Sequence, residues 1–254
     1  MALDRALTHD LPMTVFPGYL AGPGEAEMAL AAFLDGREEW NHHHPDAHST
    51  VAVHEDTTTL ITLDIDPTAV SRWAIASYRS PRGLLEWTAT FSSNAPAEAA
   101  LAVARRLSWA LAQPTDEQRD THLWGTEEQD TDEQIQAEAA RAGWTSTGDT
   151  STTMTHESAD RTAGLTIRGY YERPASADTD QVFTLWAGPA GRQDPHWRAQ
   201  FTRFAPPALI LAALHTLTRP APYQRRASEI PMYHRSYLRT HPVTRPRPEA
   251  TPAR

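Results

Sequence analysis

The stretch Trp87-Thr-Ala-Thr-Phe91, followed by Ser92-Ser-Asn-Ala-Pro96, determines the fold class predicted for this chain. Its large apolar side chains recur at every second position, which is the period of a strand with one face buried and the other in water. The polar residues and the proline that come next are typical of the start of a helix. The same pattern returns 110 residues later, as Trp197-Arg-Ala-Gln-Phe201 and Ala205-Pro206. We therefore predict that a strand-then-helix unit occurs twice.

Further segments with strand character precede each copy of this unit. They are short and bounded by Pro, Gly or Asp, as strands are. They cover residues 50–54, 58–64 and 72–78 in the first copy, and residues 151–156, 164–171 and 181–187 in the second. Four strands in succession predict an antiparallel meander. The fold class that follows is α+β, with two tandem repeats, each a four-stranded antiparallel sheet followed by a packed C-terminal helix.

The helix predicted to close the second copy has an unusual surface. From Pro206 or Pro207 to Thr218 it is apolar nearly all round. A helix without a polar face is covered on more than one side. We therefore expect it to pack on its own sheet and also on the other copy or on a second chain.

These patterns divide the chain into five parts. They are an N-terminal tail (1–12), a first repeat (13–113), an acidic linker (114–132), a second repeat (133–219) and a tail rich in Arg and Pro (220–254). Seven prolines in that last part oppose any long helix or central strand. We expect it to be an extended, disordered arm.

Composition narrows the possible functions. All 23 basic residues are arginines, set against 32 acids, and the formal net charge is −9. An acidic body lacks the basic footprint of a protein that binds duplex DNA, whereas the arginine-rich tail could supply one. The absence of cysteine excludes disulfides, thiolate nucleophiles and metal centres with Cys ligands. No apolar run approaches the ~20 residues that a membrane helix requires, so we expect a cytoplasmic protein without membrane contact.

The repeated Trp-x-Ala-x-Phe strand, the Ala-Pro helix start and the upstream segment Tyr19-Leu-Ala-Gly-Pro-Gly24 resemble an actinobacterial family, the domain-of-unknown-function family 317. Members of that family often carry tandem copies, and the resemblance would extend over residues 13–219. Where the family has a Ser-Pro-Asp-type turn, this chain has His54-Glu-Asp56 and His156-Glu-Ser158. The resemblance implies no reaction and no catalytic residue.

The most unusual local composition is the segment from Asn41 to His48, which contains four histidines and one aspartate. Imidazole and carboxylate groups suit Zn²⁺ or Ni²⁺. The candidate metal ligands are His42, His44, Asp46 and His48. Neighbouring histidines in an extended loop point in different directions, and the second copy has no comparable cluster. A solvated loop is therefore the alternative interpretation.

A second set of candidate residues would contact a partner protein or a nucleic acid. Rings on the outer face of a sheet stack on bases when basic groups accompany them. The candidates are Tyr78, Trp186, Arg198 and Arg203 on the predicted sheets, and Arg225, Arg226, Arg235 and Arg239 in the tail.

Motifs for catalysis or phosphate binding are missing from the sequence. The glycines from Gly18 to Gly24 are not followed by Gly-Lys-Ser/Thr, and Pro23 removes an amide donor. We therefore predict a non-catalytic interaction module, without a cofactor, that binds a protein partner or associates with itself through its duplicated sheets. Two alternatives stay open. One is a DNA- or RNA-binding protein that uses the paired sheets and the basic arm, and the other is a metal-dependent activity at the histidine-rich segment.

Overall fold

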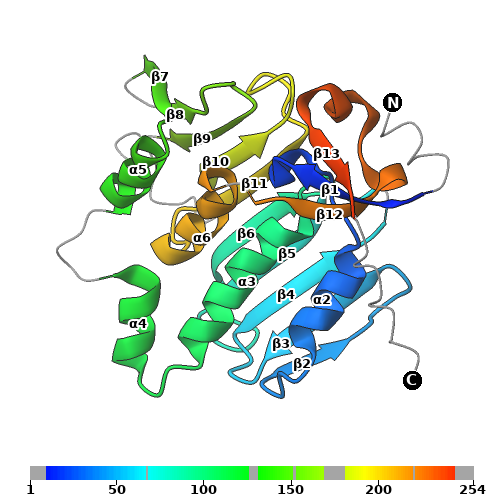
Figure 1. Cartoon of the computed structure of the whole chain (residues 1–254). Helices are drawn as coiled ribbons and strands as arrows, with labels where there is room; N and C mark the ends of the chain where they lie inside the picture. The colour runs from blue at the N-terminus through cyan, green and yellow to red at the C-terminus, as the bar shows by residue number, and fades with distance from the viewer. Residues whose placement is uncertain are drawn as a thin grey trace, which may run out of the picture.

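The computed structural model describes residues 10–66, 68–125, 131–150, 153–168, 181–219 and 221–243. Within these ranges the dominant element is one antiparallel sheet of ten strands, which we call the main sheet (Figure 1). Its strand order is β2-β3-β4-β5-β6-β11-β10-β9-β8-β7. The strands are β2 (Trp40–His43), β3 (Ser49–His54), β4 (Thr59–Asp64), β5 (Ser71–Tyr78), β6 (Leu85–Ser92), β7 (Thr145–Thr150), β8 (Thr153–Glu157), β9 (Ala163–Arg168), β10 (Gln181–Ala187) and β11 (Trp197–Thr202). Parts of two predicted strands, at residues 151–152 and 169–171, lie outside the described residues.

The prediction of two separate four-stranded sheets is wrong, because these strands all belong to the main sheet. Each half of the chain supplies five consecutive strands, and β6 pairs with β11 in the middle. Two separate sheets would leave backbone groups of β6 and β11 without hydrogen-bond partners, and their pairing satisfies those groups. The two additional strands, β2 and β7, are largely polar and do not alternate apolar with polar residues. A search for that alternation therefore does not find them.

The pairing of β6 with β11 is nearly symmetric. Thr90 lies opposite Gln200, and the flanking pairs join a phenylalanine of one strand to an alanine of the other. The Thr88 amide donates to Thr202 Oγ1 at 2.9 Å, and the Arg198 amide donates to Ser92 Oγ at 3.0 Å. The two donors, Thr88 and Arg198, are 110 residues apart, and so are the two acceptors, Ser92 and Thr202; this is the spacing of the sequence repeat. The two halves of the sheet are therefore related by an approximate two-fold axis through this pair of strands.

Helices lie on one side of the main sheet (Figure 1). They are α2 (Ala26–Leu34), α3 (Ala97–Leu111), α4 (Asp116–Trp124), α5 (Thr131–Arg141) and α6 (Pro207–Thr218). The strand side chains turned toward them include Trp73, Trp87, Phe91, Trp197 and Phe201, all of them buried. The apolar helix α6 packs against α3, α4, α5, β9 and β10, which confirms that it is covered on more than one side.

The acidic segment 114–132 contains helical structure. Thr115 caps α4, since its hydroxyl accepts a hydrogen bond from the Gln118 amide at 3.2 Å. Two carboxylates in the first turn favour the positive end of the helix dipole. The helix α5 begins at Thr131, and residues 126–130 lie outside the described part of the chain.

A second, three-stranded sheet, here called the small sheet, joins the two ends of the chain. It contains β1 (Pro12–Phe16) between β12 (Tyr223–Arg226) and β13 (Arg239–Pro242). The short 3₁₀ helices are η1 (Gly18–Leu20), η3 (Ala227–Glu229) and η4 (Met232–Tyr237). Met13, Val15, Ala227 and Ile230 form its buried core. In Figure 1 the small sheet lies on the same side of the main sheet as the helices.

The expectation of a disordered arm is therefore wrong for residues 221–243. The prolines do oppose long elements, but the described ones lie where their missing amides cost little, and Pro222 comes directly before β12. Pro231 precedes η4, and Pro242 is the last residue of an edge strand. Residues 244–254 lie outside the described ranges.

Arg225 anchors the small sheet to the helical layer. Its side chain is 4% exposed and makes two hydrogen bonds to the carboxylate of Glu98 in α3, at 2.8 and 2.7 Å. It also donates to the carbonyl oxygen of Gly22 at 3.1 Å. Two parallel charged hydrogen bonds fix both distance and orientation. This guanidinium therefore has a structural role and cannot reach an external partner.

We expect Arg225→Ala to lower the free energy of unfolding by about 2 kcal/mol, because the buried guanidinium loses its charged hydrogen bonds to the half-buried Glu98 and its bond to the Gly22 carbonyl oxygen. The matched control is Arg226→Ala. Arg226 is 60% exposed and lies 3.5 Å or more from its acidic partners, so its loss should cost less than about 1 kcal/mol. Urea unfolding of the two variants checks this, and equal losses would contradict the assignment.

Two histidines, the half-buried His196 and the buried His234, join η4 to the main sheet. The ring centroids of His196, which precedes β11, and His234 lie 4.2 Å apart, and Tyr233 contacts both rings. The Nδ1 atom of His234 is 2.7 Å from the carbonyl oxygen of Leu20. Among the described residues, His234 Nε2 and His196 Nδ1 have no hydrogen-bond partner. The site therefore favours neutral imidazoles.

Burial lowers the pKa of His196 to about 4, and the neighbouring His234 adds to this shift. Burial also lowers the pKa of His234, although its hydrogen bond to Leu20 opposes the shift. The folded state then binds fewer protons than the unfolded state, whose histidines titrate near 6.5. The contribution of these two histidines to the free energy of unfolding is fully present above about pH 6.5 and is lost as the pH falls toward 4.

We expect His196→Phe to reduce the loss of stability between pH 7 and pH 5, because phenylalanine keeps the ring contacts and takes up no proton. The measurement is the urea midpoint as a function of pH. The exposed His43, changed to Asn, is the control and should behave like the wild type. Part of the pH dependence of stability should remain in His196→Phe, because burial also lowers the pKa of His156. An unaltered slope in His196→Phe would contradict this assignment.

Candidate functional site

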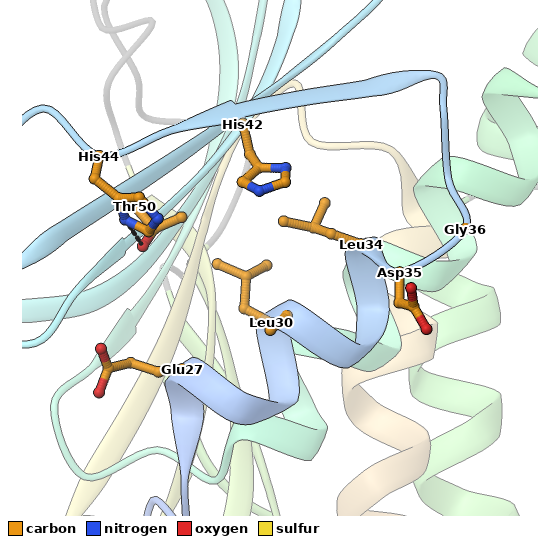
Figure 2. A pocket seen from close by; sticks show the side chains of 9 residues that line it. Glu27, Leu30, Leu34, Asp35, Gly36, His42, His44 and Thr50 are labelled. Carbon is orange, nitrogen blue, oxygen red and sulfur yellow. Dashed lines mark hydrogen bonds between the residues drawn. The ribbon is translucent and has the colours of Figure 1, made fainter.

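A pocket of about 490 Å³ lies between α2 and the outer strands of the main sheet (Figure 2). It is partly open to solvent. Its lining residues are Glu27, Leu30, Ala31, Leu34, Asp35, Gly36, His42, His44 and Thr50. The helix supplies an apolar floor, and the strands supply a polar wall.

Alternation along β2 determines which histidines reach the pocket. Trp40 is buried in the core, where its ring meets those of Phe33, at 6.1 Å, and His54, at 5.1 Å. Side chains two residues apart share a face of a strand, so His42 points to the same side as Trp40. Figure 2 shows its ring above the floor residues Leu30 and Leu34.

His44 completes the polar wall. Its Nδ1 atom is 3.0 Å from the hydroxyl oxygen of Thr50, and its ring centroid is 6.4 Å from that of His42. The hydrogen bond to Thr50 holds one imidazole in place. Both rings therefore offer polar atoms at the mouth of an apolar cavity, an arrangement common in ligand sites.

The four predicted metal ligands are not brought together. Asp46 and His48 form a turn, in which Asp46 accepts hydrogen bonds from the His48 amide at 2.8 Å and from Ser49 Oγ at 3.1 Å. His42 and His44 line the pocket instead. Across the described ranges, no group of three or more His, Asp or Glu side chains is arranged to hold a metal ion.

Two carboxylates border the apolar floor at opposite ends. Glu27 lies in the first turn of α2, near Thr50 and His44, and Asp35 follows the last turn (Figure 2). Among the described residues, no hydrogen bond or ion pair is found for either side chain. Both carboxylates are therefore available to a ligand that extends past the ends of the floor, where the Asp35 carboxylate points away from Leu30 and Leu34 (Figure 2).

The predicted contact residues do not form one surface. Arg198 is exposed and lies opposite Trp186 across β10 and β11, on the face away from the helices. Trp186 is 2% exposed and lies so close to Gly164 that a Cβ atom there would be 2.2 Å from its ring. Tyr78 is half-buried at the end of β5, and half-buried Arg203 lies over the ring of Phe204.

The tail arginines belong to the small sheet and the 3₁₀ helix beside it. Arg225 is buried, and Arg226 lies near Asp10 and Glu25. Arg235 donates to the carbonyl oxygen of Ile230 at 3.2 Å, and the guanidinium carbon of Arg239 lies 5.6 Å from the ring centre of Phe16. These contacts, and their position on the helical side, separate them from Arg198.

Sequence reasoning missed the floor of the pocket. The lining residues it did not single out are Glu27, Leu30, Ala31, Leu34, Asp35, Gly36 and Thr50. Leu30 and Leu34, one helical turn apart, are a recognisable signal of a buried helix face. Their position under the histidines depends on how α2 packs on the sheet, which a local pattern does not contain.

Residues 157–223 match the family model described as SPDY, domain of unknown function (DUF317). This range extends from the end of β8 through α6 to the start of β12. The match shows a single copy, and it gives no support to a second, tandem copy or to an actinobacterial origin. Comparisons with curated proteins and with solved structures found no significant match.

The histidine pocket lies outside the matched range, in the first half of the chain. The family model therefore does not bear on it. In the part of the chain that the structure describes, no helix is long and apolar enough to cross a membrane.

Proposed function

We propose that this protein is a non-catalytic interaction module that binds a partner protein in the pocket between α2 and the outer strands. The observation that carries the proposal is the pocket itself, with its apolar floor and its unpaired polar rim. Apolar anchors in a concave site contribute most of the binding energy of a protein interface, and the polar rim adds specificity.

The two alternative functions have less support. A nucleic-acid surface needs gathered basic groups and accessible rings, but Arg225 and Trp186 are buried. Arg198 lies on the opposite side of the main sheet from the small sheet. A metal-dependent activity would need a third ligand beside His42 and His44, and among the described residues no group of three such side chains is arranged to hold a metal ion.

Filling the pocket tests this proposal. Ala31 and Ala32 are adjacent exposed residues of α2, but Ala31 lines the pocket and Ala32 does not. A displayed library of random nine-residue peptides would be selected against the purified chain. We expect Ala31→Phe to weaken the selected peptides at least about tenfold and Ala32→Phe less than about twofold.

Equal effects of the two substitutions, or no enriched peptide, would overturn the proposal. Both variants should keep the thermal midpoint of the wild type, because both positions are solvent-exposed on a helix. That measurement separates loss of binding from loss of fold.

A further inference from the structure

The pocket lies beside an unpaired sheet edge. Of the described strands in the main sheet, β2 and β7 are the outermost. Natural proteins protect such edges with proline, lysine or a bulge. Neither strand contains proline or lysine, but the pairing of β7 with β8 is irregular between Thr147 and Thr150, whereas β2 pairs with β3 in unbroken register. The edge at β2 is therefore open to another strand.

The alternation of hydrogen-bonded and non-bonded pairs between β2 and β3 shows which backbone groups of β2 point away from β3. The Glu55 amide donates to the Glu39 carbonyl oxygen at 2.8 Å, which makes residues 39 and 55 a hydrogen-bonded pair. Such pairs alternate with non-bonded pairs along an antiparallel ladder. His42, opposite Ala52, falls on a non-bonded pair. Its N–H and C=O groups therefore point away from β3.

An added strand would place side chains in the pocket. Neighbouring strands lie ~4.8 Å apart, and alternate side chains point to the same face. The residue that pairs with His42 would therefore project on the helical side, toward Ala31, Leu30 and Leu34. A short aliphatic side chain suits this floor.

The carboxylates beside the pocket indicate which charge a ligand should carry. Glu27 and Asp35 flank the floor at either end, and no described residue pairs with either side chain. Carboxylates near an apolar anchor favour a ligand with basic residues beside its apolar one. An acidic segment would be repelled at both ends.

We propose that β2 binds an extended partner segment by strand addition, through the outward backbone groups of His42, and that the segment carries an aliphatic residue flanked by Arg or Lys. This inference rests on the proposed function, because it assigns a partner class to the same pocket. Main-chain hydrogen bonds then provide affinity, and the pocket and its rim provide selectivity.

The test uses the full chain and two synthetic nine-residue peptides, one alternating Val with Arg and one alternating Val with Glu. We expect the basic peptide to bind at least about tenfold more tightly. Glu27→Gln combined with Asp35→Asn should remove most of that difference. At saturation, hydrogen exchange of the His42 amide should slow at least about tenfold, while that of Asn41, already in the ladder, changes little.

Methylation of alternate peptide amides provides a matched pair of ligands. One pattern blocks the edge facing β2 and should abolish binding, whereas the shifted pattern blocks the outer edge and should be tolerated. Equal binding of the two patterns, or an unchanged His42 amide at saturation, would overturn strand addition. If Ala31→Phe still weakens binding in that case, the pocket function stands and only its mode is wrong. If neither peptide binds to the wild type, the inference is overturned.

Discussion

The pairing of β6 with β11 is the constraint on which the rest of the structure depends. These two strands come from different halves of the chain, yet they carry the same alternation of apolar and polar side chains. Their register places both apolar faces on one side of the main sheet. Phe91 and Phe201 then meet edge to face, with centroids 6.1 Å apart. A shift of the register by one residue would move the apolar side chains of one half to the opposite face of the sheet, so this register is strongly specified.

This central pairing determines which strands form the edges of the main sheet and where the pocket lies. Because the last strand of each half is used in the middle, the first strand of each half becomes an outer edge. The helices that close the halves, α3 and α6, are brought together over the centre and pack against each other. The helices that open the halves, α2 and α5, lie toward the outside (Figure 1). A site between an opening helix and an edge strand is a consequence of this topology.

Local patterns predicted the strands that alternate and the helix that closes each half, because both depend on neighbouring residues. The pairing of distant strands is a non-local property, so one ten-stranded sheet could not be told from two smaller sheets. The burial of Arg225 was missed for a related reason. Its partner Glu98 is 127 positions away, and a basic residue in a proline-rich segment carries no local sign of such a pairing. Two of the nine lining residues, His42 and His44, were found from composition, whereas the floor required the packing of α2.

The two halves differ in how they use the carboxylates of their opening helices. In α5, Glu138 is buried and contacts Arg141, His215 and Arg219, which attaches this helix to α6. In α2, Glu27 has no described partner. A buried carboxylate must be neutralised within the fold, whereas an exposed one can be neutralised by a ligand. The approximate symmetry is therefore broken at the opening helices: Glu138 attaches α5 to α6, whereas Glu27 of α2 stays at the sheet edge without a described partner.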